Sequence, residues 1–152
     1  MTARVLIADD SAVLRGALRA LFKGLGDYEI VEAATGTEAV EKAEESRPDL
    51  IILDFAMPVM DGLSASRLLQ KRLPEIPVLM YTMHSTDQLH AHARTAGVRR
   101  LISKCDTSDL VAAIKEVTAS SQTAMRPASV RAVGASRREG AALRMPAART
   151  GS

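Results

Sequence analysis

The chain alternates between short apolar runs and longer stretches in which apolar residues recur every three or four positions. The short runs are typical of β-strands and lie at residues 4–8, 28–33, 50–54, 77–81 and 100–103. The longer stretches predict helices at about 13–22, 36–46, 63–72, 85–96 and 107–118. Strand and helix therefore alternate five times along the chain.

The expected strands are apolar almost throughout, as the run LIIL at residues 50–53 shows. Such strands favour a parallel sheet that is covered by helices on both faces. We therefore expect an α/β fold, a three-layer sandwich with five strands and five helices. Gly24 and Gly26 follow the first helical stretch, and we interpret them as the signals that end it.

The last part of the chain has a different composition. Residues 120–152 are rich in Ala, Arg, Ser, Gly and Pro and have few large apolar residues, so they predict a disordered tail after a folded domain at 1–119. Residues 1–118 carry 14 Lys and Arg against 17 Asp and Glu, a charge of −3, whereas the remaining 34 residues carry six Arg and one Glu, a charge of +5. The basic pI of about 8.9 therefore reflects the tail and does not indicate a nucleic-acid-binding domain.

Composition also excludes several classes of protein. The apolar runs are far shorter than the ~20 residues of a membrane span, and the start MTARVLIADD does not resemble a secretory signal. With Cys105 as its one cysteine, the chain cannot form an internal disulfide. These features predict a soluble protein of the reducing cytoplasm with no membrane partner.

Polar residues follow the ends of four expected strands: Asp9 and Asp10, Asp54, Thr82 and Lys104. In an open parallel sheet these ends meet at one edge, where ligands bind. Three carboxylates in one place repel each other unless a cation lies among them, and an oxygen-rich site of this kind suits Mg²⁺. A phosphoryl group there would be stabilised by Lys104 and the Thr82 hydroxyl, with a carboxylate as nucleophile.

Asp54 is the candidate nucleophile because it ends the central strand. The AMPVMDG stretch that follows predicts a Pro and Gly turn that leaves the Asp54 carboxylate accessible.

These residues, in this order, resemble the receiver domain of two-component response regulators over roughly residues 3–118. The motifs that carry the resemblance are VLIA before Asp9 and Asp10, LDFAMPVMDG around Asp54, VLMYTMH around Thr82, and Lys104. The YTMHS stretch is similar to receivers of LuxR-type transcription factors. The resemblance implies a flavodoxin-like (βα)5 fold with strand order 2-1-3-4-5.

The resemblance also implies roles for single residues. Asp54 would accept a phosphoryl group from a histidine kinase or phosphotransfer protein, and Thr82 would move toward that group as a switch. Asp10, Asp54 and the Ala56 backbone carbonyl would bind Mg²⁺, with Asp9 acting through water. Such a protein signals and is not an enzyme, since it catalyses only its own phosphorylation and dephosphorylation. Positions Ala56 and His84 would tune the hydrolysis of the phosphoryl group.

One position departs from the family pattern. Leu101 stands three residues before Lys104, where the family usually carries Tyr or Phe, and Arg100 stands where a Gly is common. We expect an altered output surface on the helix at 85–96, the strand at 100–103 and the helix at 107–118. Its signal would be weaker, would use Tyr81 or His84 as the reporter, or would be lost. Its residues would be His90, Arg94, Arg99, Arg100 and Leu101, and it would bind a downstream protein or a second copy in a homodimer.

Other interpretations remain open from the sequence. Asp9 and Asp10 could cap the first helix in competition with Ser11, and Lys104 could be an ordinary surface residue. The spacing of His84, His90 and His92 does not favour a zinc site. Besides a stand-alone phosphoacceptor, the chain could be the receiver of a truncated DNA-binding regulator, which would then bind DNA, or a phosphorylation-independent pseudo-receiver. The scarcity of aromatic residues argues against an FMN-binding flavodoxin.

Overall fold

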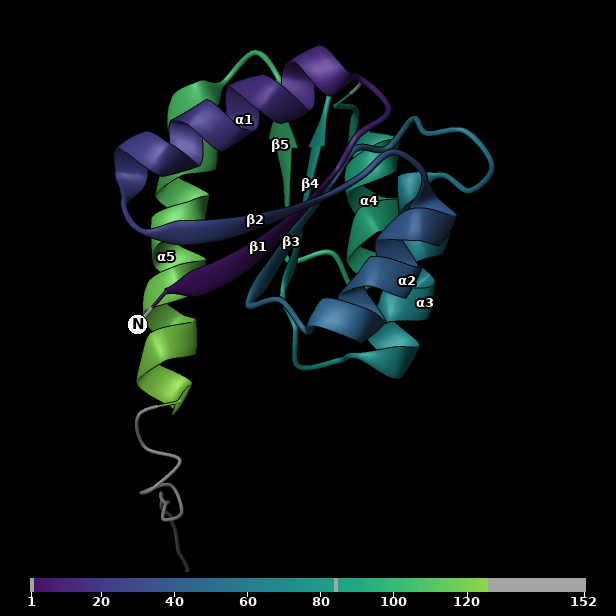
Figure 1. Ribbon diagram of the computed structural model, residues 1–152. Coiled ribbons are helices and arrows are strands. Elements are labelled where there is room, and N and C mark those ends of the chain that lie inside the picture. Colours follow the sequence, from purple (N-terminus) through teal and green to yellow (C-terminus); the bar gives the residue numbers. More distant parts are fainter. Residues whose placement is uncertain (1, 84, 126–152) are drawn as a thin grey trace, which may run out of the picture. The chain divides into compact units, whose positions relative to one another are not determined.

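The protein forms a five-stranded parallel sheet between two layers of helices (Figure 1). The computed structural model describes residues 2–83 and 85–125, with side chains described as far as residue 119. The strands are β1 (Ala3–Ala8), β2 (Tyr28–Ala33), β3 (Leu50–Leu53), β4 (Val78–Thr82) and β5 (Arg100–Ser103). The helices are α1 (Ala12–Leu25), α2 (Gly36–Ser46), α3 (Gly62–Arg72), α4 (Asp87–Thr95) and α5 (Thr107–Met125). The strand order β2-β1-β3-β4-β5 confirms the predicted flavodoxin-like fold.

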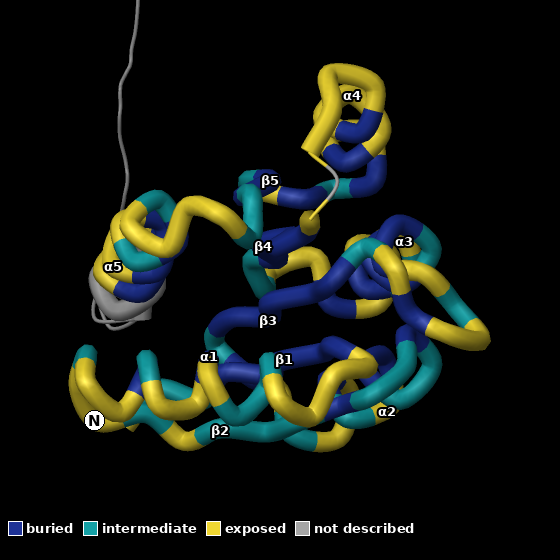
Figure 2. Tube along the Cα trace, turned by 90° about the horizontal axis from the view of Figure 1, so that it is seen from above, coloured by how far each residue is buried: buried dark blue, intermediate teal, exposed yellow. Residues whose placement is uncertain are grey.

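Alternate residues of each inner strand enter two separate cores. Leu50 and Ile52 of β3 pack toward α1 and α5, whereas Ile51 and Leu53 pack toward α2, α3 and α4. Because both faces are covered, β3 is buried at all four positions, which explains its unbroken apolar sequence (Figure 2). The register pairs Ile52 with Ile7 of β1 and with Leu79 of β4, so the three strands end at the same edge.

Hydroxyl or carboxylate side chains begin four of the helices. Ser11, Thr35, Asp61 and Thr86 each accept a hydrogen bond from the backbone N–H three residues later. These bonds satisfy donors that have no partner inside the helix. Since Ser11 caps α1, the interpretation of Asp9 and Asp10 as caps is wrong.

The ends of three helices, α1, α4 and α5, differ from those expected. Gly24 lies inside α1, and Gly26 is the residue whose N–H closes the last turn on the Phe22 carbonyl. Gly24 is exposed and its site is open, so the helix passes through it at a modest conformational cost. The helix α4 is shorter than predicted, because Thr86 rather than residue 84 is its N-cap.

Residues Met1–Thr118 form one compact unit. The helix α5 continues to Met125, so residues 120–125, which were expected to begin the tail, are helical. The boundary at 119 and the disorder of residues 126–152 remain predictions, because those residues lie outside the described part of the chain. Within the described residues, no helix has the length and apolar character needed to cross a membrane.

Candidate functional site at the carboxyl edge of the sheet

Backbone hydrogen bonds fix three of the candidate residues just beyond their strands. The Asp9 N–H donates to the Ala33 carbonyl on β2, at 3.0 Å. The Asp54 N–H donates to the Ala8 carbonyl on β1, at 2.9 Å, and the Lys104 N–H donates to Thr82 on β4, at 2.8 Å. Each residue thus extends the hydrogen-bond pattern of the sheet by one step. The positions of these side chains follow from the strand register.

The structure brings the three carboxylates together. Asp9, Asp10 and Asp54 can each place one carboxylate oxygen within 4.8 Å of the others. Asp9 and Asp54 are buried, and Asp10 is exposed. In the residues that the structure describes, this is the one cluster of three or more such side chains that could hold a metal ion. Its oxygen donors fit a hard cation such as Mg²⁺.

Lys104 supplies the positive charge beside these carboxylates. Its Nζ lies 2.9 Å from Oδ2 of Asp9 and 3.3 Å from Oδ1 of Asp54. Burial by itself would lower the pKa of Lys104, but the hydrogen bond that Lys104 donates to Asp9 and the charge of Asp54 outweigh it and raise the pKa. The Lys104 ammonium thus pairs with two buried carboxylates, and the interpretation as an ordinary surface lysine is wrong.

Asp54 carries the opposite perturbation. Burial raises the pKa of its carboxyl, the charge of Asp9 raises it further, and the ion pair with Lys104 offsets only part of this rise. The sequence led us to expect an accessible carboxylate, yet the side chain is only 7% exposed. The expectation was wrong because Lys104 lies against the carboxylate and the following loop folds back under it.

The loop between β3 and α3 folds tightly beneath Asp54. The Gly62 N–H donates to the Phe55 carbonyl at 2.8 Å. A Cβ atom at Gly62 would lie 2.3 Å from the Asp54 carbonyl oxygen, so this position requires glycine. At the tip, Met60 N–H donates to Pro58 at 2.7 Å across Val59, which adopts a φ of 71° in a strained turn. Ala56 is exposed in this loop.

The remaining predicted residues lie at different depths. Thr82 is the last residue of β4 and is fully buried. Tyr81 belongs to the core that the sheet forms with α1 and α5, and its hydroxyl donates to the Lys104 carbonyl at 3.5 Å. His84 lies outside the described residues.

The predicted output surface is only partly on the surface. His90, Arg94 and Arg99 are exposed. Arg100 pairs with Asp109 and with Glu116 of α5. Leu101 is 8% exposed and belongs to the core beneath α4, so its assignment to a contact surface is wrong. The physical reason is strand alternation, which turns Leu101 toward the apolar side of α4.

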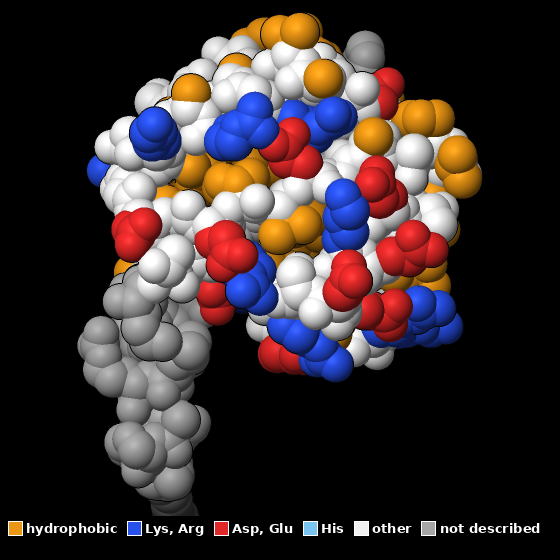
Figure 3. All heavy atoms as spheres, in the orientation of Figure 1, with side chains coloured by type: hydrophobic (Ala, Val, Ile, Leu, Met, Phe, Trp, Pro, Cys, Tyr) orange, Lys and Arg blue, Asp and Glu red, His pale blue; other side chains and the backbone are white. Residues whose placement is uncertain are grey.

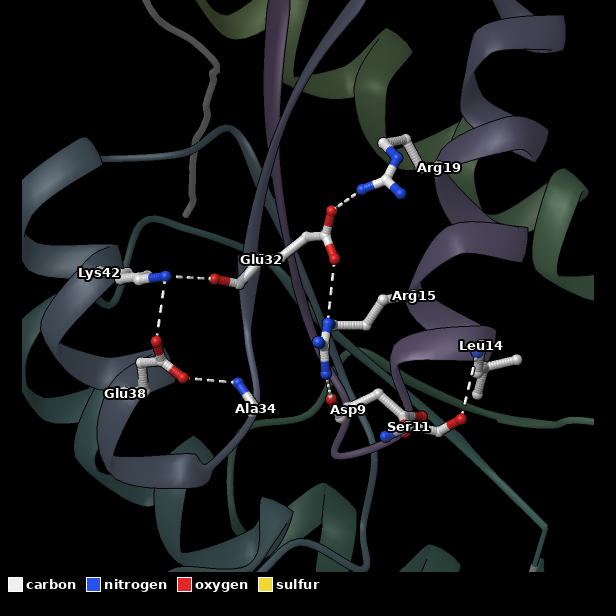
Figure 4. A network of polar contacts seen from close by, with 9 residues as sticks. All are labelled: Asp9, Ser11, Leu14, Arg15, Arg19, Glu32, Ala34, Glu38 and Lys42. Atoms are coloured by element: carbon white, nitrogen blue, oxygen red, sulfur yellow. Dashed lines mark hydrogen bonds and ion pairs between the residues drawn. The ribbon is translucent and has the colours of Figure 1, made fainter.

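Sequence reasoning missed Arg15. This residue lies near the N-terminus of α1, where the helix dipole disfavours a positive charge. Its Nη1 donates to the Asp9 carbonyl at 2.5 Å, and its Nε lies 2.9 Å from Oε1 of Glu32 (Figure 4). An arginine placed against the helix dipole was the signal that could have identified it.

Comparisons with known proteins agree with this geometry. The family described as "Response regulator receiver domain" matches residues 5–115. The response regulator protein VraR of Staphylococcus aureus is 36% identical over 128 residues, which cover 84% of this chain and 61% of VraR. The chain thus spans about three fifths of that relative.

Solved structures show the same similarity. A DNA-binding response regulator of the LuxR family from Staphylococcus aureus is 31% identical, with a TM-score of 0.70, over 76% of this chain and 98% of that one. A CheY-like receiver domain protein from Methanospirillum hungatei is 26% identical, with a TM-score of 0.75, over 81% and 98%. The chain therefore belongs to the response regulator receiver family, and it contains the receiver domain of a two-component signalling protein.

Proposed function

We propose that Asp54 accepts a phosphoryl group from the phosphohistidine of a histidine kinase or phosphotransfer protein. The observation that carries this proposal is the meeting of Asp9, Asp10 and Asp54 around the Lys104 ammonium at one edge of the sheet. A carboxylate oxygen of Asp54 attacks phosphorus, an acyl-phosphate bond forms, and the bond to the imidazole nitrogen breaks. The chain would signal by this modification.

The residues around Asp54 support this chemistry. Asp10, Asp54 and the Ala56 carbonyl would hold Mg²⁺, with Asp9 acting through water. When bound, the ion neutralises the charge of the phosphoryl oxygens. Lys104 would bind one phosphoryl oxygen, since its Nζ lies 3.3 Å from Oδ1 of the nucleophile Asp54. Thr82 would move and hydrogen-bond a different phosphoryl oxygen.

The test uses Mg²⁺ and acetyl phosphate as a small phosphodonor, with intact mass as the readout. We expect a gain of one phosphoryl group that is stable in acid, labile in base and absent in Asp54→Asn. Asp27→Asn is the matched control, because Asp27 is exposed and directly precedes β2, at the end of that strand away from the acidic site. No gain in a folded protein that binds Mg²⁺ would indicate a receiver that accepts the group only from its kinase. No gain from a phosphorylated histidine kinase or phosphotransfer protein either would contradict the proposal and favour a phosphorylation-independent receiver.

The output is part of the same proposal. The exposed side chains of α4 and Arg99 form a basic surface that would bind a downstream protein or a second copy of the chain. We place the protein in the cytoplasm, with residues 1–119 as the receiver and 120–152 as a tail.

A second candidate is the receiver portion of a DNA-binding regulator. Similarity to a LuxR-family structure described as DNA-binding favours it. The face drawn in Figure 3 mixes acidic and basic side chains, so among the described residues this view offers no continuous basic patch. A salt titration of DNA binding with and without residues 120–152 tests whether the basic tail supplies the contact. Equal binding by both forms would exclude the tail.

A further inference from the structure

Arg15 links the acidic site to the neighbouring strand and helix. One end of its guanidinium donates to the Asp9 carbonyl, and the other pairs with Glu32 on β2. The side chain is only 17% exposed, although it carries a full charge. A largely buried arginine with two fixed partners has a defined orientation, because the planar guanidinium donates hydrogen bonds in fixed directions.

Glu32 is itself held from both sides (Figure 4). Its carboxylate also pairs with Arg19, one turn further along α1. Its carbonyl accepts from Nζ of Lys42 at 2.6 Å, and Lys42 pairs with Glu38 of the same helix at 3.1 Å. Glu38 in turn accepts from the Ala34 N–H at 2.7 Å. These contacts thus anchor Glu32, the partner of Arg15, to both α1 and α2.

The contact with Asp9 acts on a peptide plane rather than on a side chain. The Asp9 carbonyl belongs to the peptide bond between Asp9 and Asp10, so its orientation fixes the directions in which both carboxylates leave the backbone. A second bond, from the Ser11 N–H to Oδ1 of Asp9 at 2.8 Å, holds the side chain of Asp9. Without Arg15, the peptide loses this restraint, and the bond between the Ser11 N–H and the Asp9 carboxylate loses the support of a fixed peptide plane.

We propose that Arg15 is a positioning residue of the acidic site, held by Glu32, and that it presets the Asp9–Asp10 loop for a divalent cation. This inference rests on the proposed function, because that function supplies the cation. It assigns no contact between Arg15 and the ion.

A positioning role and a purely electrostatic role for Arg15 predict opposite changes in Mg²⁺ affinity when Arg15 is removed. A positive charge beside three carboxylates weakens the binding of a cation, so its removal alone would tighten Mg²⁺ binding. Loss of a group that orients metal ligands weakens binding, typically by about 10- to 100-fold. The sign of the change therefore separates the two roles.

The experiment titrates the full chain with Mg²⁺ and follows backbone amide signals by NMR. We expect Arg15→Met to raise the Kd for Mg²⁺ by roughly tenfold. Arg19→Met is the matched control, because it removes the same charge from the same Glu32 without touching Asp9, and its Kd should change by less than about twofold. Arg15→Lys keeps the charge but not the two-ended contact, and it should fall between wild type and Arg15→Met.

A Kd for Arg15→Met that equals or falls below that of Arg19→Met would overturn the inference, as would full rescue by Arg15→Lys. Urea unfolding of each variant separates a local effect from general loss of stability. Hydrogen exchange of the Ser11 amide provides a readout without the cation: it should speed up in Arg15→Met and not in Arg19→Met. If wild type fails to bind Mg²⁺, the proposed function fails, and unchanged Ser11 exchange would then reject the positioning role by itself.

Discussion

Two neighbouring regions match the receiver family to different degrees. One is the acidic site, made of Asp9, Asp10, Asp54 and Lys104, and the other is the β5–α4 region, made of strand β5 and the helix α4 that covers it. At the acidic site, buried polar groups satisfy one another, and backbone bonds to neighbouring strands fix their positions. In the β5–α4 region, Leu101 packs into an apolar core and Arg100 is engaged by acids on α5. The departures from the family pattern are thus confined to packing around β5. The proposed acceptance of a phosphoryl group and the proposed output therefore rest on separate interactions in this chain.

The largest expected effect tests the acidic site. Lys104→Met removes the ammonium that lies 3.3 Å from Asp54, so the rate of phosphorylation by acetyl phosphate should fall about 100-fold or more. The same change removes a cation that competes for the carboxylates, so the Kd for Mg²⁺ should decrease. Lys115→Met, at an exposed position of α5, should change neither quantity. An unchanged phosphorylation rate in folded Lys104→Met would contradict the assigned role.

The second prediction tests the β5–α4 region. Leu101→Ala removes a buried side chain from the core beneath α4 and should lower the free energy of unfolding by about 3 kcal/mol, measured in urea. The Kd for Mg²⁺ and the phosphorylation rate should stay at their wild-type values. Val13→Ala, at a position that is 84% exposed, serves as the control and should cost far less. A changed Mg²⁺ affinity in Leu101→Ala would show that the two regions are coupled.

A third prediction concerns the loop beneath Asp54. Gly62→Ala places a Cβ against the Asp54 carbonyl oxygen and should lower the free energy of unfolding by about 2 kcal/mol, with weaker Mg²⁺ binding. Gly24→Ala is the matched control, since no atom lies within 4 Å of its Cβ position inside α1. That change should stabilise the protein by about 0.5–1 kcal/mol. Equal effects of the two substitutions would mean that the close approach at Gly62 is unimportant.

The smallest effect follows from the raised pKa of Asp54. A carboxyl whose pKa is higher in the folded state binds its proton more tightly after folding, so its ionised form costs stability above that pKa. Without Mg²⁺ at pH 7, Asp54→Asn should therefore be more stable than wild type. The difference should shrink as the pH falls through the raised pKa and the wild-type carboxyl becomes protonated. A difference that grows in acid would refute this sign.

Much of this organisation could be predicted from local patterns. The alternation of strands and helices, the parallel sheet and the placement of Asp9, Asp54 and Lys104 at one edge follow from periodicity and from where the strands end. Parallel strands bring their carboxyl ends together whatever the loops do, so polar residues at those positions must meet.

The features that the sequence did not reveal depend on three-dimensional packing. Arg15 is held by Glu32, 17 residues later, and periodicity does not report such a pair. Leu101 and Ile102 are both apolar, and no pattern within β5 tells which of them faces α4. The burial of Asp54 involves Lys104, which lies against its carboxylate and is remote in the chain.

The register of β3 also determines where the chain tolerates changes in length. Leu50 and Ile52 enter one core and Ile51 and Leu53 the other, so one residue inserted within β3 would exchange the two sets. It would also displace Asp54 by one step from Asp9 and Lys104. A residue inserted in the connection between α2 and β3 would leave both the core and the carboxylate in place. Insertions and deletions should therefore accumulate at the amino edge of the sheet, and the spacing from Leu50 to Asp54 should stay constant while the residues within it change.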